Sequence, residues 1–299
     1  YANEFLKKAL GPQAEKITVP DSLFEGKHIE PVFDDAITVL LSSSSNYACY
    51  LGVAVESLLR NRDKRKNYDL IVFETTLNDG QKNSITKRVS KEHSCSIRFI
   101  NVSELLSSYN NLFYVYNSFS KETYYRLFAA SILYSYDKVI YIDADTLVLS
   151  DLTELWSTDI DDFYIAGVKD YVLQGYAKNY EVKKGGDIRK YIENVLDLRY
   201  QDYIQCGILL MNLKEMRRSG FVEKALNILQ LLRKPLFVDQ DVLNKACAGK
   251  IAILPPRYNF LMYYASRINE IDYSFRAEIT ADKDNIKIFH MPGGHPDEF

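Results

Sequence analysis

The sequence predicts an α/β fold with a mostly parallel central sheet. Strand-like and helix-like segments alternate from residue 36 to residue 142, which is typical of a doubly wound sheet. The first strand-like segment, Ala36–Leu41, is a continuous apolar run, as expected for a strand buried on both faces. The 299 residues, 47% of them hydrophobic, suffice for one large core. Ligands of such sheets bind beside the carboxyl ends of the strands.

The first half of the chain carries the regular alternation. Tyr47, Leu51, Val55 and Leu58 recur at helical spacing directly after the first strand. The expected strands are Ala36–Leu41, Tyr68–Phe73, Ser96–Val102 and Lys138–Ile142, and the helices between them are Tyr47–Leu58, Gln81–Lys91 and Lys121–Tyr136.

The second half is less regular. The polar stretch Asp170–Asp187 is expected to be a loop. Further strands are expected at Phe163–Val168, Ile208–Asn212, Ile251–Leu254 and Ile286–Phe289, and further helices at Ile188–Leu198, Phe221–Arg233 and Val238–Ala248.

Residues 1–34 form an irregular lead-in. Glu4–Leu10 could make one short helix that Gly11 and Pro12 end, and Pro20 and Pro31 punctuate a loop after it. We therefore expect an N-terminal extension or linker over 1–34 and a single folded domain over 35–299.

Composition excludes several classes of protein. The net charge is −3, so the chain as a whole lacks the basic footprint of a nucleic-acid binder. No apolar run approaches the roughly 18 residues of a membrane helix. The four cysteines are widely spaced without a CxxC pair, which argues against a zinc site and fits reduced thiols in a cytoplasm. The 23 tyrosines suit a sugar ligand, although drift of composition and packing explain them as well.

An acidic pair ends the fourth expected strand. Asp143 and Asp145 follow the apolar run Val139–Ile142 directly. Two neighbouring carboxylates are costly unless a cation joins them, and hard oxygen ligands suit Mg²⁺ or Mn²⁺. His290, after the last expected strand, could supply a nitrogen ligand. A solvated turn is the alternative for an isolated Asp-x-Asp.

Two chemistries use a pair of this kind. In nucleotide-sugar transfer, a metal neutralises the departing diphosphate. In phosphatases of the haloacid-dehalogenase type, the first Asp of Asp-x-Asp-x-Thr is the nucleophile, and Asp143–Thr146 matches that spacing. Three strand–helix units precede the pair here, whereas that phosphatase fold opens with this strand, so the transfer chemistry is favoured.

Six ordered motifs between Ile37 and His290 resemble the retaining glycosyltransferases of family 8, which include lipopolysaccharide galactosyl- and glucosyltransferases and glycogenin. Each motif alone is weak, and their common order makes the resemblance specific. The motifs are Ser45–Ala48, Thr123–Leu127, Lys138–Val148 with Leu152–Trp156, Cys206–Leu213, Val238–Asn244 and His290–Gly293.

The resemblance implies a GT-A fold and a Mn²⁺- or Mg²⁺-dependent transfer of glucose or galactose from a UDP-sugar. It implies that Asp143, Asp145 and His290 hold the metal, and that Arg126, Asp239 and Gln240 take part in catalysis. Gln240 would stabilise the sugar by its polarity rather than attack it, since an amide is a poor nucleophile. The implied donor-binding residues are Ser42, Ser43, Ser44, Asn46, Tyr47, Arg126, Asp143, Ala144, Asp145, Asp170, Gln205, Cys206, Asp239, Gln240 and Gly293.

The chain departs from the family pattern at three positions. Ser44 replaces a usual Asp in the turn after the first strand, and Gln205 replaces an Asn that is one methylene shorter. Pro296 stands where the family has a Lys that neutralises diphosphate. Another residue could substitute for it, the C-terminal part could be truncated, or transfer could be slow.

The expected partners are UDP-glucose or UDP-galactose and a glycan, lipid-linked or protein-linked sugar acceptor, without nucleic acid. The alternatives to the transferase are a catalytically silent nucleotide-sugar or glycan-binding domain of the same fold and, less favoured, a phosphatase of the haloacid-dehalogenase type. A cytoplasmic location is expected. A segment outside this chain could add peripheral contact with the inner face of a membrane. The acceptor region is expected around Asp170–Asp187 and Phe260–Arg276, where Tyr171, Tyr176, Tyr180, Tyr258, Tyr263 and Tyr264 are candidate sugar platforms.

Overall fold

A computed structural model gives the structure of the chain. It describes residues 16–20, 23–26, 28–116, 119–178, 188–266, 268–269, 271 and 273–293.

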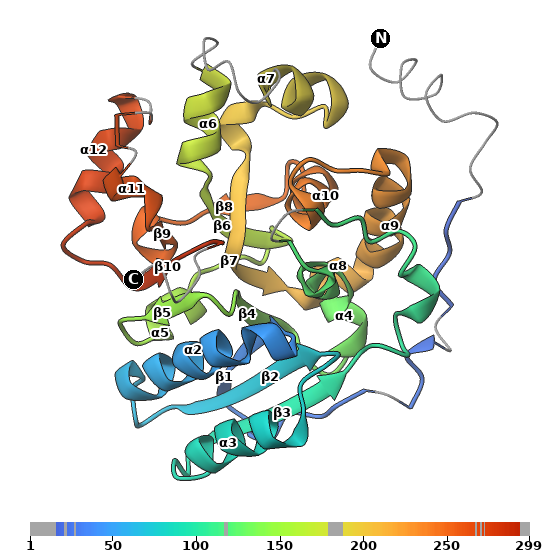
Figure 1. Ribbon diagram of the computed structural model, residues 1–299, viewed down its shortest axis with the longest axis vertical. Helices are drawn as coiled ribbons and strands as arrows, with labels where there is room; N and C mark the ends of the chain where they lie inside the picture. The colour runs from blue at the N-terminus through green and yellow to red at the C-terminus, as the bar shows by residue number, and fades with distance from the viewer. Residues whose placement is uncertain are drawn as a thin grey trace.

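Seven strands form the central sheet, in the order β3-β2-β1-β4-β7-β6-β8 (Figure 1). Their bounds are β1 Ala36–Ser43, β2 Asn67–Glu74, β3 Cys95–Asn101, β4 Lys138–Ile142, β6 Ile165–Lys169, β7 Ile204–Asn212 and β8 Ile251–Ile253. The sheet confirms the expected α/β class and the mostly parallel arrangement.

Strand β7 is the exception, because it runs antiparallel to both of its neighbours, β4 and β6. The segments after β6 stay at the edge where that strand ends, and the backbone N–H of Asp170 donates to Tyr203 O at 3.0 Å. This hydrogen bond joins the end of β6 to the start of β7, so β7 starts at this edge and runs the opposite way.

Helices cover both faces of the sheet. Side chains of β1 alternate between the two layers. Val39 and Leu41 belong to the core cluster that includes residues of α2 and α3, and Leu40 belongs to the cluster on the opposite face, which includes residues of α4, α8, α9 and α10. This double burial accounts for the continuous apolar run. The helix bounds are α2 Ala48–Asn61, α3 Asp79–Val89, α4 Ala129–Ile132, α5 Thr153–Trp156, α6 Tyr171–Lys178, α7 Ile188–Lys190, α8 Leu213–Arg218, α9 Phe221–Leu232, α10 Val238–Ala246, α11 Tyr263–Ser266 and α12 Tyr273–Asp282.

Three expected elements differ in the structure. The expected helix Ile188–Leu198 consists of the three-residue α7 followed by a π-helix over Tyr191–Val195. Lys121–Tyr136 is not one α-helix: a 3₁₀ helix, η4, spans Lys121–Phe128, and the short α4 follows it. All five residues from Tyr124 to Phe128 are buried, so this segment lacks the polar face of an amphipathic helix. The expected loop Asp170–Asp187 begins with helix α6, and residues 179–187 lie outside the described part.

A second, three-stranded sheet holds the last expected strand. Its order is β5-β10-β9, with β5 at Thr146–Val148, β9 at Phe260–Leu261 and β10 at Ile288–His290. Strand β10 pairs antiparallel with β5, which places His290 opposite Thr146. This small sheet therefore brings the end of the described chain back beside β5, the strand that directly follows the acidic pair (Figure 1).

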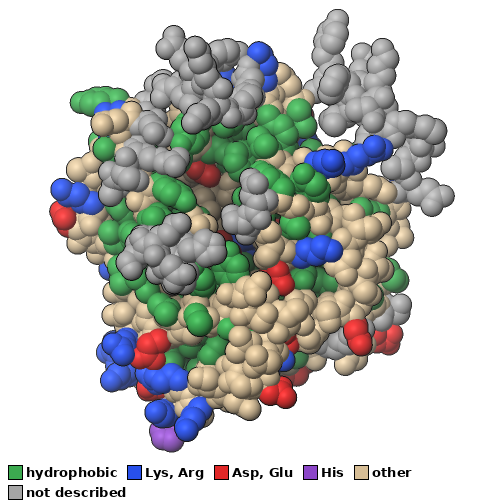
Figure 2. Space-filling model, viewed as in Figure 1, with side chains coloured by type: hydrophobic (Ala, Val, Ile, Leu, Met, Phe, Trp, Pro, Cys, Tyr) green, Lys and Arg blue, Asp and Glu red, His purple; other side chains and the backbone are tan. Residues whose placement is uncertain are grey.

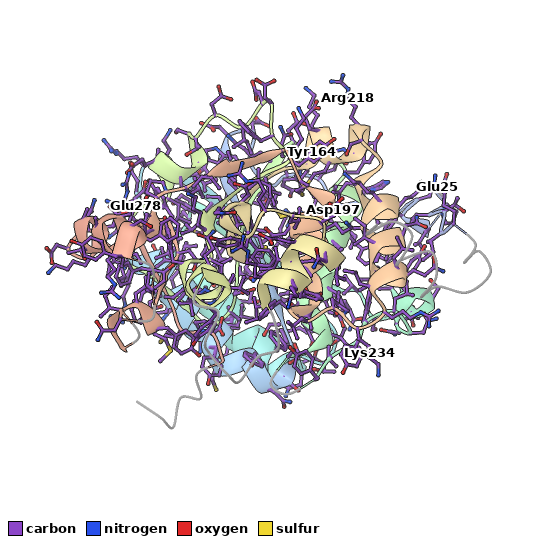
Figure 3. The ribbon with its side chains drawn as sticks, turned by 90° about the horizontal axis from the view of Figure 1, so that it is seen from above. Glu25, Tyr164, Asp197, Arg218, Lys234 and Glu278 are labelled. Carbon is purple, nitrogen blue, oxygen red and sulfur yellow. The ribbon has the colours of Figure 1, made fainter. Side chains whose placement is uncertain are left out.

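The described part of the lead-in lies along α9. The backbone N–H groups of Ile17 and Val19 each donate at 2.9 Å to side chains of that helix, those of Asn227 and Glu223. Figure 3 shows Glu25 of the lead-in and Glu278 of α12 at opposite ends of the molecule. The expected helix Glu4–Leu10 lies outside the described residues. Within those residues, the helices are all too short or too polar to cross a membrane.

Candidate functional site

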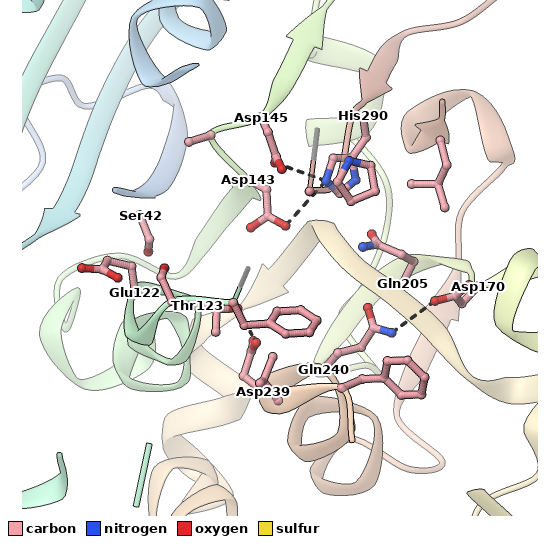
Figure 4. A pocket seen from close by; sticks show the side chains of 18 of the residues that line it. Ser42, Glu122, Thr123, Asp143, Asp145, Asp170, Gln205, Asp239, Gln240 and His290 are labelled. Atoms are coloured by element: carbon pink, nitrogen blue, oxygen red, sulfur yellow. Dashed lines mark hydrogen bonds and ion pairs between the residues drawn. The ribbon is translucent and has the colours of Figure 1, made fainter. Parts of the chain in front are cut away.

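A pocket of about 390 Å³ opens at the carboxyl ends of β1 and β4, the edge where the sequence places the ligand. Figure 4 shows the acidic pair and His290 on one side and Gln240 with Asp170 on another. Most of the expected residues line it: Ser42, Ser43, Ser44, Tyr47, Arg126, Asp143, Ala144, Asp145, Asp170, Gln205, Asp239, Gln240, His290 and Gly293.

Two of the expected residues do not line the pocket. Asn46 is exposed, and the side chain of Cys206 is fully buried in the core. Cys206 contributes through its backbone, because its N–H donates to Gln240 and its carbonyl oxygen accepts from Arg126. Both residues thus stay outside the cavity surface that the structure describes.

Asp143, Asp145 and His290 form a compact acidic cluster. His290 Nε2 lies 3.3 Å from Asp145 Oδ1 and 3.8 Å from Asp143 Oδ2 (Figure 4). One ligand atom from each of the three lies within 4.8 Å of the others. Gly207 makes this approach feasible, because a Cβ there would meet His290 Cε1 at 2.1 Å and Asp143 Oδ2 at 2.8 Å.

The donor set fits a divalent cation. His290 is 1% exposed, and its Nε2 makes no hydrogen bond to any described residue, although it faces the two carboxylates. Burial lowers the pKa of His290, but contact with Asp145 and the charges of both aspartates outweigh burial and raise that pKa. The cluster therefore favours a positive charge beside the carboxylates, and two oxygens with one imidazole nitrogen suit Mn²⁺ or Mg²⁺.

Asp143 is the more enclosed of the two carboxylates. Burial raises its pKa to about 6, with a further contribution from the charge of Asp145, while Arg126 opposes the shift. The hydroxyl of Tyr141 donates to Asp143 Oδ1 at 2.8 Å, and Arg126 Nη1 lies 3.3 Å from the same oxygen. Oδ2 is the oxygen that faces His290.

Arg126 joins the acidic cluster to the start of α10. Its guanidinium donates to Asp239 Oδ2 and to the carbonyl oxygen of Cys206, and its carbon lies 4.5 Å above the ring of Tyr141. Burial lowers the pKa of Arg126, but the charges of Asp239 and Asp143, the neighbouring Tyr141 and the hydrogen bond to Asp239 together outweigh burial and raise that pKa, so the group remains a cation. Arg126 thus supplies a fixed positive charge in the wall of the pocket.

Gln240 is held by hydrogen bonds at both ends of its amide. Its Oε1 accepts from the backbone N–H of Cys206 at 3.0 Å, and its Nε2 donates to Asp170 Oδ2 at 3.2 Å (Figure 4). Burial raises the pKa of Asp170, and hydrogen bonds from Leu173 and Gln240 oppose that shift. Val238, the residue before Asp239 and Gln240, has a positive φ of 44°, a backbone conformation that a β-branched residue rarely adopts.

The serine run offers an unpaired polar atom. Ser42 is 6% exposed, and its Oγ finds no hydrogen-bond partner among the described residues. Tyr47 lines the same wall. A buried hydroxyl without a partner is costly, so a ligand hydroxyl or amide here would complete its hydrogen bonding.

Sequence reasoning missed several residues of this site. Thr123 donates to Asp239 and accepts from Arg126 at 2.9 Å, and Glu122 also lines the pocket. Asn259, which contacts His290, carried no motif of its own. Thr123 precedes Arg126 by three residues, a spacing that places two side chains on the same face of a 3₁₀ helix, and this spacing is the signal that could have identified Thr123.

The candidate tyrosine platforms divide into two groups. Tyr176 and Tyr263 line the pocket and remain candidates for contact with a sugar. Tyr171, Tyr258 and Tyr264 are buried and serve packing. Tyr180 and Pro296 lie outside the described residues.

The model of the family described as glycosyl transferase family 8 matches residues 38–295. The chain belongs to glycosyltransferase family 8. The family agrees with the motif order in the sequence and with the position of the pocket at the carboxyl edge of the sheet.

Curated relatives support this membership of family 8. A putative glycosyltransferase of Haemophilus influenzae is 31% identical over 225 residues, 75% of this chain and 63% of the relative. General stress protein A of Bacillus subtilis is 25% identical over 87% of both chains. A lipopolysaccharide 1,2-glucosyltransferase of Escherichia coli K12 is 24% identical over 79% of this chain and 65% of its own length.

Solved structures share the GT-A fold of this family 8 chain. The bifunctional glycosyltransferase WbbM superposes with a TM-score of 0.79 and 28% identity over 90% of this chain. The chain spans only 47% of WbbM. The galactosyltransferase LgtC, solved with donor and acceptor sugar analogues, gives a TM-score of 0.70 and 22% identity, with 87% of this chain and 90% of LgtC covered.

Proposed function

We propose that this chain is a Mn²⁺-dependent retaining hexosyltransferase that moves glucose or galactose from a UDP-sugar to a glycan or glycoconjugate acceptor. The observation that carries the proposal is the cluster of Asp143, Asp145 and His290, in which the imidazole Nε2 faces two carboxylates inside the pocket. Membership of family 8 and the glucosyltransferase among the relatives agree with hexosyl transfer.

The acidic cluster and Arg126 provide opposite charges beside one another in the pocket. Asp143, Asp145 and His290 would hold the metal, which when bound would offset the charge that develops on the leaving diphosphate. Arg126 is fixed by Asp239 and the carbonyl oxygen of Cys206, so its charge is already oriented before a ligand binds.

Gln240 and Asp170 are the candidates for contact with the donor sugar. The Gln240 amide is oriented by a backbone N–H and by Asp170, so its polarity is fixed without being consumed in a reaction. Asp239 is already engaged by Thr123 and Arg126, which makes it a poor nucleophile. These contacts support front-face attack by the acceptor hydroxyl, with Gln240 stabilising the positively charged sugar centre.

Release of UDP from UDP-glucose and UDP-galactose in the presence of Mn²⁺ tests the proposal. We expect turnover of one of the two donors by the wild-type chain and at least a hundredfold loss in Asp145→Ala, because Asp145 supplies a charged ligand. NMR of the product anomer then tests retention. Turnover that persists without any divalent ion would contradict the metal dependence.

A silent nucleotide-sugar-binding domain is the second candidate. The Pro296 departure favours it, while the preserved cluster and the ordered contacts of Arg126 and Gln240 favour an enzyme. Calorimetry with UDP separates the two, since binding of UDP without release from either donor would identify the binding domain.

A further inference from the structure

Asn259 is a fully buried amide that touches the proposed metal ligand His290. Its Oδ1 lies 2.8 Å from His290 Nδ1, and its Nδ2 donates to Gln205 Oε1. The residue is 0% exposed and does not line the pocket surface. It therefore acts on a ligand only through the two side chains that it contacts.

The hydrogen bonds that connect Gly207, Gln205, Asn259 and His290 begin at an irregularity of strand β7. The pairing of β6 with β7 shifts between Gly167 and Val168, so Cys206, Gly207 and Ile208 have no partner on β6. The backbone N–H of Gly207 donates instead to Gln205 Oε1 at 2.6 Å. Such bulges commonly redirect groups beside active sites.

The direction of every hydrogen bond follows from that backbone N–H. A backbone N–H can only donate, so the atom of Gln205 beside it must be Oε1. Because Oε1 also faces Asn259, Asn259 must present its Nδ2 to Gln205 and its Oδ1 to His290. His290 Nδ1 must then carry the proton, which leaves the lone pair of the neutral ring on Nε2.

We propose that Asn259 is a positioning residue that fixes the Nδ1–H tautomer of His290 and so presents Nε2 to a divalent cation. The inference rests on the proposed metal site. Metal-binding histidines usually donate their second ring N–H to a partner of this kind, which fixes both the tautomer and the ring orientation.

The same hydrogen bonds orient the side-chain amide of Gln205. Both hydrogen bonds of Gln205 end on its Oε1, so its Nε2 remains to donate toward the pocket that the residue lines. Gln205 is also the position where the chain departs from the family's shorter Asn. Asn259 therefore orients a metal-facing atom and a ligand-facing amide at the same time.

Nitrogen-15 NMR of the imidazole rings tests the tautomer without metal or turnover. The chain has four histidines, so the His290 signals can be assigned by comparison with His290→Gln. At alkaline pH, where the ring is neutral, we expect a protonated Nδ1 and a bare Nε2 in the wild-type protein. A His290 ring protonated at Nε2 would overturn the proposal, whatever the variants do.

Mn²⁺ affinity, measured by electron paramagnetic resonance of the unbound ion, tests the consequence. We expect Asn259→Leu to weaken Mn²⁺ binding about 10- to 100-fold, the usual effect of losing such a partner, and to release the tautomer. Asn259→Asp keeps an oxygen acceptor for Nδ1–H and should retain the wild-type tautomer. A folded Asn259→Leu with unchanged affinity and tautomer would refute the proposal.

Asn212→Leu is the matched control. Asn212 is another buried asparagine, and its side chain donates to Ile160 O and accepts from Glu215 N. It lies at the end of β7, away from the bulge beside Gln205. We expect it to lower stability without changing Mn²⁺ affinity. These readouts need no sugar transfer, so a chain that binds Mn²⁺ through the Nδ1–H tautomer yet releases no UDP would refute the proposed function and leave this inference standing.

Discussion

At the residue scale, Asp143 and Asp145 lie two positions apart but have different surroundings. Asp143 shares one oxygen with Tyr141 and Arg126, so part of its charge is already balanced. Asp145 faces His290, and its backbone carbonyl accepts from Met291 N at 3.0 Å. The two carboxylates therefore differ: Asp143 is held by Tyr141 and Arg126, whereas Asp145 contacts the imidazole of His290.

The absence of a side chain at Gly207 decides whether the cluster can form. We expect Gly207→Ala to weaken Mn²⁺ binding at least tenfold and to cost about 1–3 kcal/mol of stability, because the new methyl group overlaps the His290 ring. Calorimetric titration with Mn²⁺ and urea denaturation measure the two effects.

Gly52→Ala is the control for that substitution. Gly52 lies inside α2, and a Cβ there meets no atom within 4 Å. Because Ala is the better helix former, the free energy of unfolding should rise by about 0.5–1 kcal/mol. Equal effects of the two substitutions would show that crowding of His290 is unimportant.

Arg126 is a residue whose geometry matters beyond its charge. Arg126→Lys keeps the cation but cannot reach Asp239, Cys206 O and Thr123 together, so acceptors are left unpaired. We expect stability to fall by about 1–3 kcal/mol and UDP release to fall at least tenfold. Urea denaturation and the UDP assay check both values, and wild-type values in both would show that any cation suffices.

At the element scale, the 3₁₀ geometry of η4 explains a pair of contacts. Residues three apart are eclipsed in a 3₁₀ helix, so Thr123 and Arg126 project from one face. Both bind the carboxylate of Asp239. The sequence predicts a helix here, and the structure adds that it is wound as a 3₁₀ helix with five consecutive buried residues.

Helix α3 begins with a capping box. The Asn78 side chain accepts from Gln81 N, and the Gln81 side chain accepts from Asn78 N. We expect Asn78→Ala to lower the free energy of unfolding by about 1 kcal/mol, measured by urea denaturation. Asn83→Ala inside the same helix is the control and should be neutral or slightly stabilising. Equal losses in both variants would contradict the role of the cap.

At the scale of the whole molecule, the described lead-in is packed on the domain. Phe24 is 5% exposed and belongs to the core cluster that includes α9. We expect Phe24→Ala to lower the free energy of unfolding by about 3 kcal/mol, a value typical of losing a buried ring. Val32→Ala, at a side chain 49% exposed, should change stability by less than about 0.5 kcal/mol. Denaturation curves that coincide for Phe24→Ala and wild type would instead support the interpretation of residues 1–34 as a linker that does not stabilise the domain.

Charge is distributed unevenly over the molecule. Exposed Arg60, Lys64, Arg65 and Lys66 follow one another near the end of α2, while carboxylates gather in the pocket at the other edge of the sheet. Figure 2 shows Lys and Arg side chains at the lower left, over the ends of α2 and α3. The net charge of −3 conceals this separation, because composition averages over the surface.

The sequence by itself determined the elements whose signal is local. The apolar run of β1, the spacing of α2 and the Asp-x-Asp at the end of β4 could all be read directly, because side-chain periodicity and strand ends are properties of neighbouring residues. The tertiary structure decided the antiparallel direction of β7, its bulge, the winding of η4 and the contact of Asn259 with His290. These features depend on residues that meet only after the chain has folded, since the missing Cβ of Gly207 and the buried amide of Asn259 act on His290, which is distant in sequence.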